Sequence, residues 1–133
     1  MLKRVITAAA FLTMLCSPAA APCEEGTVVT ELTVTTRVVK GKPVDSVRSI
    51  SSSSPRTLYC FTRVARTEET ETVIRHVWYR DDEKVAESEL PVRGASWRTY
   101  SKKLIPAKSA GKWRVEVLDA SGTLLKSREF KVN

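Results

Sequence analysis

The sequence predicts an all-β protein built as an antiparallel sandwich of about seven strands. Short runs rich in β-branched and aromatic residues alternate with runs of glycine, proline, serine and charged residues. This is the pattern of strands separated by turns. After the apolar N-terminal segment, no stretch repeats apolar residues at the spacing of three and four that an amphipathic helix requires. Both observations favour strands along the chain after that segment.

The expected strands are runs of alternating apolar and polar residues bounded by polar turns. The strands cover residues 27–39, 57–65, 72–80, 85–92, 96–104, 112–119 and 123–132, and short turns are expected at residues 66–71, 81–84 and 120–122. Residues 41–56 contain Gly41, Pro43, Pro55 and a run of four serines. Because these residues interrupt strands and favour turns, we expect a long exposed loop there.

Strand alternation predicts which side chains face the core. The first strand places Val28, Leu32, Val34 and Val38 on one face. Residues 57–65 are apolar on both faces, which favours a central strand.

The strand at residues 112–119 has the most regular alternation. Its apolar side chains are Trp113, Val115 and Val117, and its charged side chains on the opposite face are Lys112, Arg114 and Glu116. Only one register buries the apolar face, so we assign Trp113 to the core as an anchor.

The strand number and the turn spacing of about 8–12 residues are typical of an immunoglobulin-like sandwich. The disulfide pattern of true immunoglobulin domains is not expected, because Cys23 precedes the first strand. A small β-barrel is the alternative architecture. Either way, residues 27–133 are predicted to form a single domain.

Residues 1–19 are predicted to be a secretory signal peptide. Lys3 and Arg4 precede an apolar run over residues 5–15 that is too short to span a bilayer. Ser17 and Ala19 supply the small residues of a cleavage site, so the exported chain is expected to begin near residue 20. Residues 20–26 would then form a flexible leader.

Export implies a periplasmic or secreted protein. Attachment to lipid is disfavoured, because a lipid-modified cysteine needs a small residue before it. Leu15 precedes Cys16 and Pro22 precedes Cys23. No later segment is apolar enough to cross a membrane.

Two cysteines remain after the predicted cleavage, Cys23 and Cys60. An even number in an oxidising compartment is consistent with a disulfide. Cys60 also lies in an apolar strand, where a free cysteine behaves as a small buried hydrophobe, and both alternatives remain open. Two cysteines and one histidine fit no zinc site, so no metal is expected.

Several segments resemble a known bacterial family. They are LYCFTRV (58–64), IRHVWYRDDEKV (74–85), SWRTYSKKLIP (96–106), GKWRVEVLDASGTLL (111–125) and the final FKV (130–132). Their order and content resemble the family called domain of unknown function 2914. The resemblance implies a compact exported or envelope-associated β domain with no established activity. Lys102 and Lys103 stand where a serine and a lysine are more usual, which weakens any role carried over to that position.

No catalytic constellation is evident. The chain has one histidine, His76, which alternation places on the same face as Ile74 and Trp78. We therefore interpret His76 as a packed structural residue. Asp81 and Asp82 lie in a turn, where aspartates are common. We expect neither an enzyme nor a cofactor.

The tryptophans allow two interpretations. Trp78 and Trp97 would form a sugar-stacking platform if they were exposed on a sheet face. Buried, they would belong to the core. Trp97 and Arg98 must point to opposite faces of one strand, and we expect Trp97 inward and Arg98 outward.

Charge is unevenly distributed. The formal net charge is +7 and the pI is about 9.6. Residues 90–115 contain seven basic residues and no acidic ones, whereas residues 67–89 contain eight acidic and three basic residues. Such asymmetry can attract a charged partner. The candidate binding surface is Trp78, Trp97, Arg98, Lys102 and Lys103.

The favoured function is a non-catalytic interaction or accessory module of the cell envelope. Its partner would be an envelope protein, a glycan or an anionic surface, and an exported chain is not expected to meet nucleic acid. A carbohydrate-binding module using exposed tryptophans is the alternative, and a hydrolase is the third.

Overall fold

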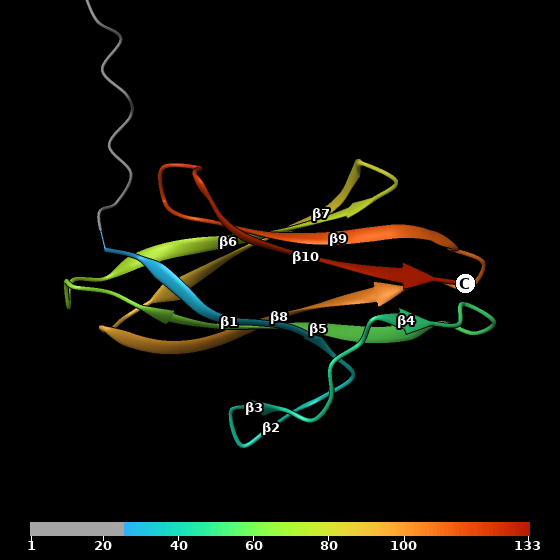
Figure 1. The fold of residues 1–133 in the computed structure, drawn as a ribbon, viewed down its shortest axis with the longest axis horizontal. Coiled ribbons are helices and arrows are strands. Elements are labelled where there is room, and N and C mark those ends of the chain that lie inside the picture. The colour runs from blue at the N-terminus through green and yellow to red at the C-terminus, as the bar shows by residue number, and fades with distance from the viewer. Residues whose placement is uncertain (1–25) are drawn as a thin grey trace, which may run out of the picture.

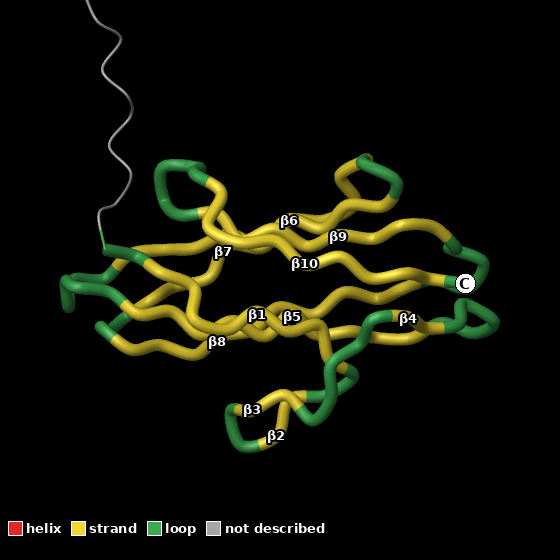
Figure 2. Tube along the Cα trace, in the orientation of Figure 1, coloured by secondary structure: helices red, strands yellow, loops and turns green. Residues whose placement is uncertain are grey.

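The computed structural model describes residues 26–133, which form two large sheets packed face to face and a small two-stranded one (Figure 1). These residues contain strands and loops without a helix (Figure 2). The main strands are β1 (Val28–Thr35), β5 (Arg56–Ala65), β6 (Thr72–Arg80), β7 (Glu83–Val92), β8 (Ser96–Ile105), β9 (Gly111–Leu118) and β10 (Leu124–Val132). The predicted signal peptide, Cys23 and most of the leader lie outside the described residues.

One sheet has three strands in the order β1-β5-β8, and the other has five in the order β4-β10-β9-β6-β7. The short strand β4 (Ser49–Ile50) runs parallel to β10, and every other pair is antiparallel. The two sheets do not close on each other, so the predicted sandwich is correct and the barrel alternative is wrong.

The segment predicted as a long exposed loop has structure of its own. It contains the hairpin β2 (Val38–Val39) and β3 (Lys42–Pro43) as well as β4. Lys40 and Gly41 have φ angles of 51° and 70°, as the central residues of a tight type I′ hairpin turn require. This hairpin lies on the side of the three-stranded sheet that faces away from the other sheet (Figure 1).

The rest of this segment is anchored to the C-terminal end of the chain. Val47 and Ile50 are buried in the core. Ser52 donates from its backbone N–H and its hydroxyl to the Asn133 carbonyl, at 2.8 and 2.7 Å. The glycine, proline and serine content of this segment predicted an exposed loop, although Val47 and Ile50 within it are buried.

The predicted face of β1 is wrong at its start. The pairing of β1 with β5 shifts between Val29 and Glu31, as in a β-bulge. An extra residue reverses the alternation, so Val29 points inward and Val28 is 57% exposed. Leu32 and Val34 are buried as expected.

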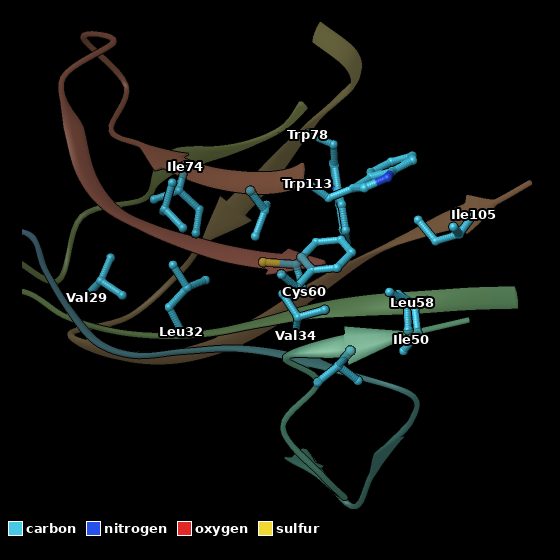
Figure 3. Close-up of a cluster of buried hydrophobic side chains, with 14 of the residues drawn as sticks. Val29, Leu32, Val34, Ile50, Leu58, Cys60, Ile74, Trp78, Ile105 and Trp113 are labelled. Atoms are coloured by element: carbon cyan, nitrogen blue, oxygen red, sulfur yellow. The ribbon is translucent and has the colours of Figure 1, made fainter. Parts of the chain in front are cut away.

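Aliphatic and aromatic side chains from both sheets fill the space between them (Figure 3). Trp113 is 2% exposed, and its indole N–H donates to the Ser109 carbonyl at 3.0 Å. Its ring stacks on Phe130 with centroids 6.0 Å apart, and Trp78 meets Phe130 edge to face at 6.2 Å. The position of Trp113 is the one that strand alternation predicts.

Candidate functional site

A polar cluster inside the sandwich joins the two sheets through His76. Its Nδ1 lies 2.6 Å from Ser101 Oγ on β8, and its Nε2 lies 2.8 Å from Thr62 Oγ1 on β5. His76 and Thr62 are fully buried, and Ser101 is nearly so. Strand alternation directs all three side chains inward, and the packing of the two sheets brings them together.

A serine beside a histidine also occurs in hydrolases, where the two serve as nucleophile and base, but this cluster lacks other parts of such a site. The second nitrogen of His76 meets the Thr62 hydroxyl instead of a carboxylate. Burial lowers the pKa of His76 from 6.5 to about 4, so the ring is neutral and a poor proton acceptor. The arrangement satisfies buried polar groups and ties the sheets together.

Cys60 lies beside the same cluster as a free thiol. Its Sγ is 3.9 Å from His76 Nε2 and 4.0 Å from Thr62 Oγ1. Burial raises the pKa of the thiol to about 12, so it stays protonated and unreactive. Cys60 forms no disulfide in this structure, and Cys23 lies outside the described residues.

The adjacent aspartates of the β6–β7 turn have structural partners. Asp81 accepts a hydrogen bond from the backbone N–H of Lys112 at 2.9 Å. Asp82 pairs with Arg114 at 2.6 Å, and that guanidinium also lies over the Tyr79 ring. These contacts attach the turn to β9, so both carboxylates have a structural role.

The tryptophans do not form a sugar-binding platform. Trp78 is fully buried, which corrects its assignment to a binding surface: its face of β6 is the core face. Trp97 is half-buried and packs against the core from β8, as its predicted inward position requires. With Trp113 also buried, Trp97 is the one tryptophan that keeps some exposure, so the three rings do not form an exposed platform.

The predicted basic strip needs one correction. Arg98 and Lys102 are exposed on the outer face of β8, the face turned away from the five-stranded sheet. Lys103 pairs with the buried Leu58, so it leaves the strand on the core side. Its ammonium group donates to the Leu104 carbonyl at 3.0 Å. Consecutive lysines in a strand cannot share a face.

Two further exposed side chains lie between and beside these cations. Tyr100 is 50% exposed and Leu104 is 55% exposed, and both alternate with Arg98 and Lys102 along β8. Tyr59 on β5 meets Tyr100 edge to face, with centroids 5.7 Å apart. We call Arg98, Tyr100, Lys102 and Leu104 the β8 outer face. The Gly41 turn of the hairpin lies against the Arg98 side chain.

The two sheets leave an opening between β7 and β8. This opening, of about 580 Å³, is lined by Tyr59, Ser88, Glu89, Tyr100, Ser101 and Lys102. Its lining includes Ser101, the partner of His76. Glu89 of β7 and Lys102 of β8 therefore lie on opposite sides of this opening.

The sequence did not identify Ser101, Thr62, Tyr59 or Glu89. Ser101 and Thr62 follow the inward alternation of their strands, but only the packing of one sheet on the other shows that they meet His76. Strand alternation places Tyr100 on the same outward face as Arg98 and Lys102, and the structure agrees.

Residues 26–133 contain no helix long and apolar enough to cross a membrane. Within this part of the chain, no three histidine, cysteine or acidic side chains are grouped as metal ligands.

Comparison with solved structures identifies the class of fold. The chain resembles an immunoglobulin-like protein from Pseudomonas aeruginosa with a TM-score of 0.55 at 10% identity, covering 84% of this chain and all of that one. The chain is thus an immunoglobulin-like β-sandwich. Residues 71–132 match the family described as Protein of unknown function (DUF2914). This match supports the family assignment that the sequence resemblance predicted.

Two larger proteins contain similar folds. An alkylpurine DNA glycosylase from Pseudomonas fluorescens bound to DNA matches with a TM-score of 0.56 at 16% identity, over 85% of this chain and 31% of that one. A β-D-mannosidase from Dictyoglomus thermophilum matches with a TM-score of 0.51 at 11% identity, over 80% of this chain and 13% of that one. At these identities the likenesses show the fold alone. No curated protein matches the chain.

Proposed function

We propose that the protein is an exported, non-catalytic interaction module of the bacterial cell envelope that binds an anionic partner through the β8 outer face. The observation that carries this proposal is the alternation of Arg98, Tyr100, Lys102 and Leu104 on an exposed strand. Cations beside exposed aromatic and aliphatic groups offer charge attraction together with apolar contact.

The interior supports the non-catalytic part of the proposal. The histidine is buried and neutral, and the aspartates of the β6–β7 turn hold β9 in place. An uncharged sugar fits the β8 outer face less well than an anionic partner does. Tyr59 and Tyr100 are inclined at 64° to each other, so the two rings do not form the flat platform on which a pyranose stacks.

The double variant Arg98→Ala/Lys102→Ala is expected to weaken binding to an anionic surface about tenfold or more. Each basic side chain near such a surface contributes ~1 kcal/mol, and a tenfold change corresponds to about 1.4 kcal/mol. Binding is measured by titration at low and high salt, with vesicles containing anionic lipid in one arm and a polyanionic glycan in the other. The arm that binds identifies the source of the anionic groups.

The matched control is Lys126→Ala/Lys131→Ala, which removes the same charge from exposed positions on β10. It should leave binding nearly unchanged. Equal losses in both double variants would show that net charge alone drives binding, and absence of binding in both arms would rule out an anionic partner.

Export is tested separately. Cells producing the full chain should release a protein that begins near Ala20 outside the cytoplasm, because Ser17 and Ala19 form the predicted cleavage signal. N-terminal sequencing of fractionated cells checks this. Soluble cytoplasmic protein that retains Met1 would contradict the proposed location.

A further inference from the structure

We propose that two copies of this chain associate through the open side of the sandwich, with β8 of each copy pairing with β7 of the other. In the described residues, β8 has one hydrogen-bonded neighbour, β5, and β7 has one, β6. Each strand therefore ends its sheet with an edge of unpaired backbone groups. Such an edge is a template for another strand.

The two edges lie on the same side of the molecule. Both line the opening that contains Glu89, Tyr100 and Lys102. A two-fold axis parallel to the strands would place the three-stranded sheet of one copy beside the five-stranded sheet of the other. The same operation forms two identical seams, as a closed two-fold dimer requires.

Strand direction favours this pairing. β7 and β8 are consecutive strands, and the chain reverses direction between them at residues 93–95. A rotation about an axis parallel to the strands preserves strand direction, so β8 would meet β7 of the second copy in antiparallel orientation. Both strands are ten residues long, enough for several backbone hydrogen bonds on each seam. Pro91 lacks an N–H, so pairing would centre on the part of β7 before it.

The charges on the two edges are complementary. Glu87 and Glu89 are exposed on β7, and Arg98 and Lys102 are exposed on β8. The rotation keeps each residue at its own level along the strands. Because Glu89 and Lys102 line one opening, Glu89 of the second copy would arrive beside Lys102 of the first.

Glu89 and Lys102 are available for this contact. Glu87 is already paired with Arg75 at 3.3 Å and with Lys84. Among residues 26–133, neither Glu89 nor Lys102 forms an ion pair. A second copy would supply the opposite charge to each.

The same charges oppose other arrangements of two copies. Pairing β8 with β8 would bring Arg98 and Lys102 against their own copies, and pairing β7 with β7 would bring Glu87 and Glu89 together. Like charges across a strand pair are unfavourable. The edges thus favour the mixed β7–β8 pairing, which makes a second copy of this chain the occupant that fits both seams at once.

Charge reversal gives a sharp test by sedimentation equilibrium of the protein produced from the full chain. The unmodified protein should form a dimer that weakens as salt is added. Glu89→Lys alone and Lys102→Glu alone should each lower association about tenfold or more, because each substitution turns attraction into repulsion at both seams.

Mixing the two variants should restore dimers. At one seam of the mixed pair, the lysine introduced in the first copy faces the glutamate introduced in the second. At the other seam, the unmodified Lys102 of the first copy faces the unmodified Glu89 of the second, so both contacts are attractive again. Amide hydrogen exchange on the unmodified protein should show concentration-dependent protection in β7 and β8, which distinguishes strand pairing from contact through side chains alone.

The control variant is Glu129→Lys, which makes the same charge change on β10, three strands from β7 in the sheet order. It should dimerise like the unmodified protein. A monomer at every soluble concentration would overturn the proposal. So would a dimer that is insensitive to Glu89→Lys and Lys102→Glu, or one that Glu129→Lys weakens equally, because its contacts would then lie elsewhere.

Discussion

Trp113→Ala is expected to leave the protein largely unfolded at neutral pH. Trp113 is 2% exposed, stacks on Phe130 and donates its indole N–H to the Ser109 carbonyl. Replacing a buried tryptophan by alanine typically costs ~3–5 kcal/mol, a large part of the ~5–15 kcal/mol by which an ordinary domain is stable. Urea and thermal unfolding followed by circular dichroism measure the loss.

The control for Trp113→Ala is the surface variant Arg98→Ala/Lys102→Ala. Both of its side chains are exposed, and exposed charges contribute ~0–1 kcal/mol each to stability. At protein concentrations too low for the proposed dimer to form, its melting temperature should stay close to that of the unmodified protein. If it melts as early as Trp113→Ala, the β8 outer face has a structural role and the proposed binding surface is wrong.

Conservative replacements separate the hydrogen bond of Trp113 from its volume. Trp78 is equally buried, but its indole N–H has no partner among the described residues. Trp113→Phe removes a hydrogen bond to a carbonyl, whereas Trp78→Phe removes an unsatisfied donor. In urea unfolding, Trp113→Phe should therefore lower the free energy of unfolding by about 1 kcal/mol more than Trp78→Phe does. This difference is the contribution of a typical hydrogen bond, here the one to the Ser109 carbonyl.

The strands were readable from the sequence because alternation is a local property. β9 alternates apolar and charged residues, and its apolar face is the buried one. Alternation also placed His76 and Trp78 on one face of β6, but it could not tell that this face was the core. The exposed or buried state of a face depends on the other sheet, which the strand's own residues do not describe.

Prediction failed where a single residue changed the pattern. The β-bulge in β1 exchanged the roles of Val28 and Val29, and nothing in the local sequence marks it. In the loop at residues 41–56, isolated apolar residues such as Val47 and Ile50 reach the core between polar neighbours. Periodicity does not detect side chains that are buried one at a time.

The family segments contribute residues to the interior, which explains why the resemblance predicted the fold better than the function. The motif with Phe61 and Thr62 is buried, as is the one with His76 and Trp78. Thr62 and His76 are partners in the inter-sheet cluster. Asp119, which directly follows β9 in the segment 111–125, is 1% exposed and accepts hydrogen bonds from the turn that follows. Residues that hold sheets together do not identify a ligand.

The stability of the protein should fall by about 2 kcal/mol between pH 7 and pH 5. Burial lowers the pKa of His76 from 6.5 to about 4 in the folded protein. Between these two values the unfolded chain binds a proton at this site and the folded protein does not. Stability therefore rises with pH across that window and is lost on acidification. Each unit of difference in pKa corresponds to about 1.4 kcal/mol.

Urea unfolding at pH 7, 6 and 5 measures this slope, and His76→Gln is the matched variant. Glutamine keeps a polar group facing Ser101 and Thr62 but does not titrate, so its stability should be nearly independent of pH over the same range. His76 is the only histidine in the chain, and the carboxyl groups with shifted pKa values, Asp45 and Glu87, have them lowered from already acidic values. A slope that persists in His76→Gln would show that another group titrates, and that the interior histidine is not held neutral by the sandwich.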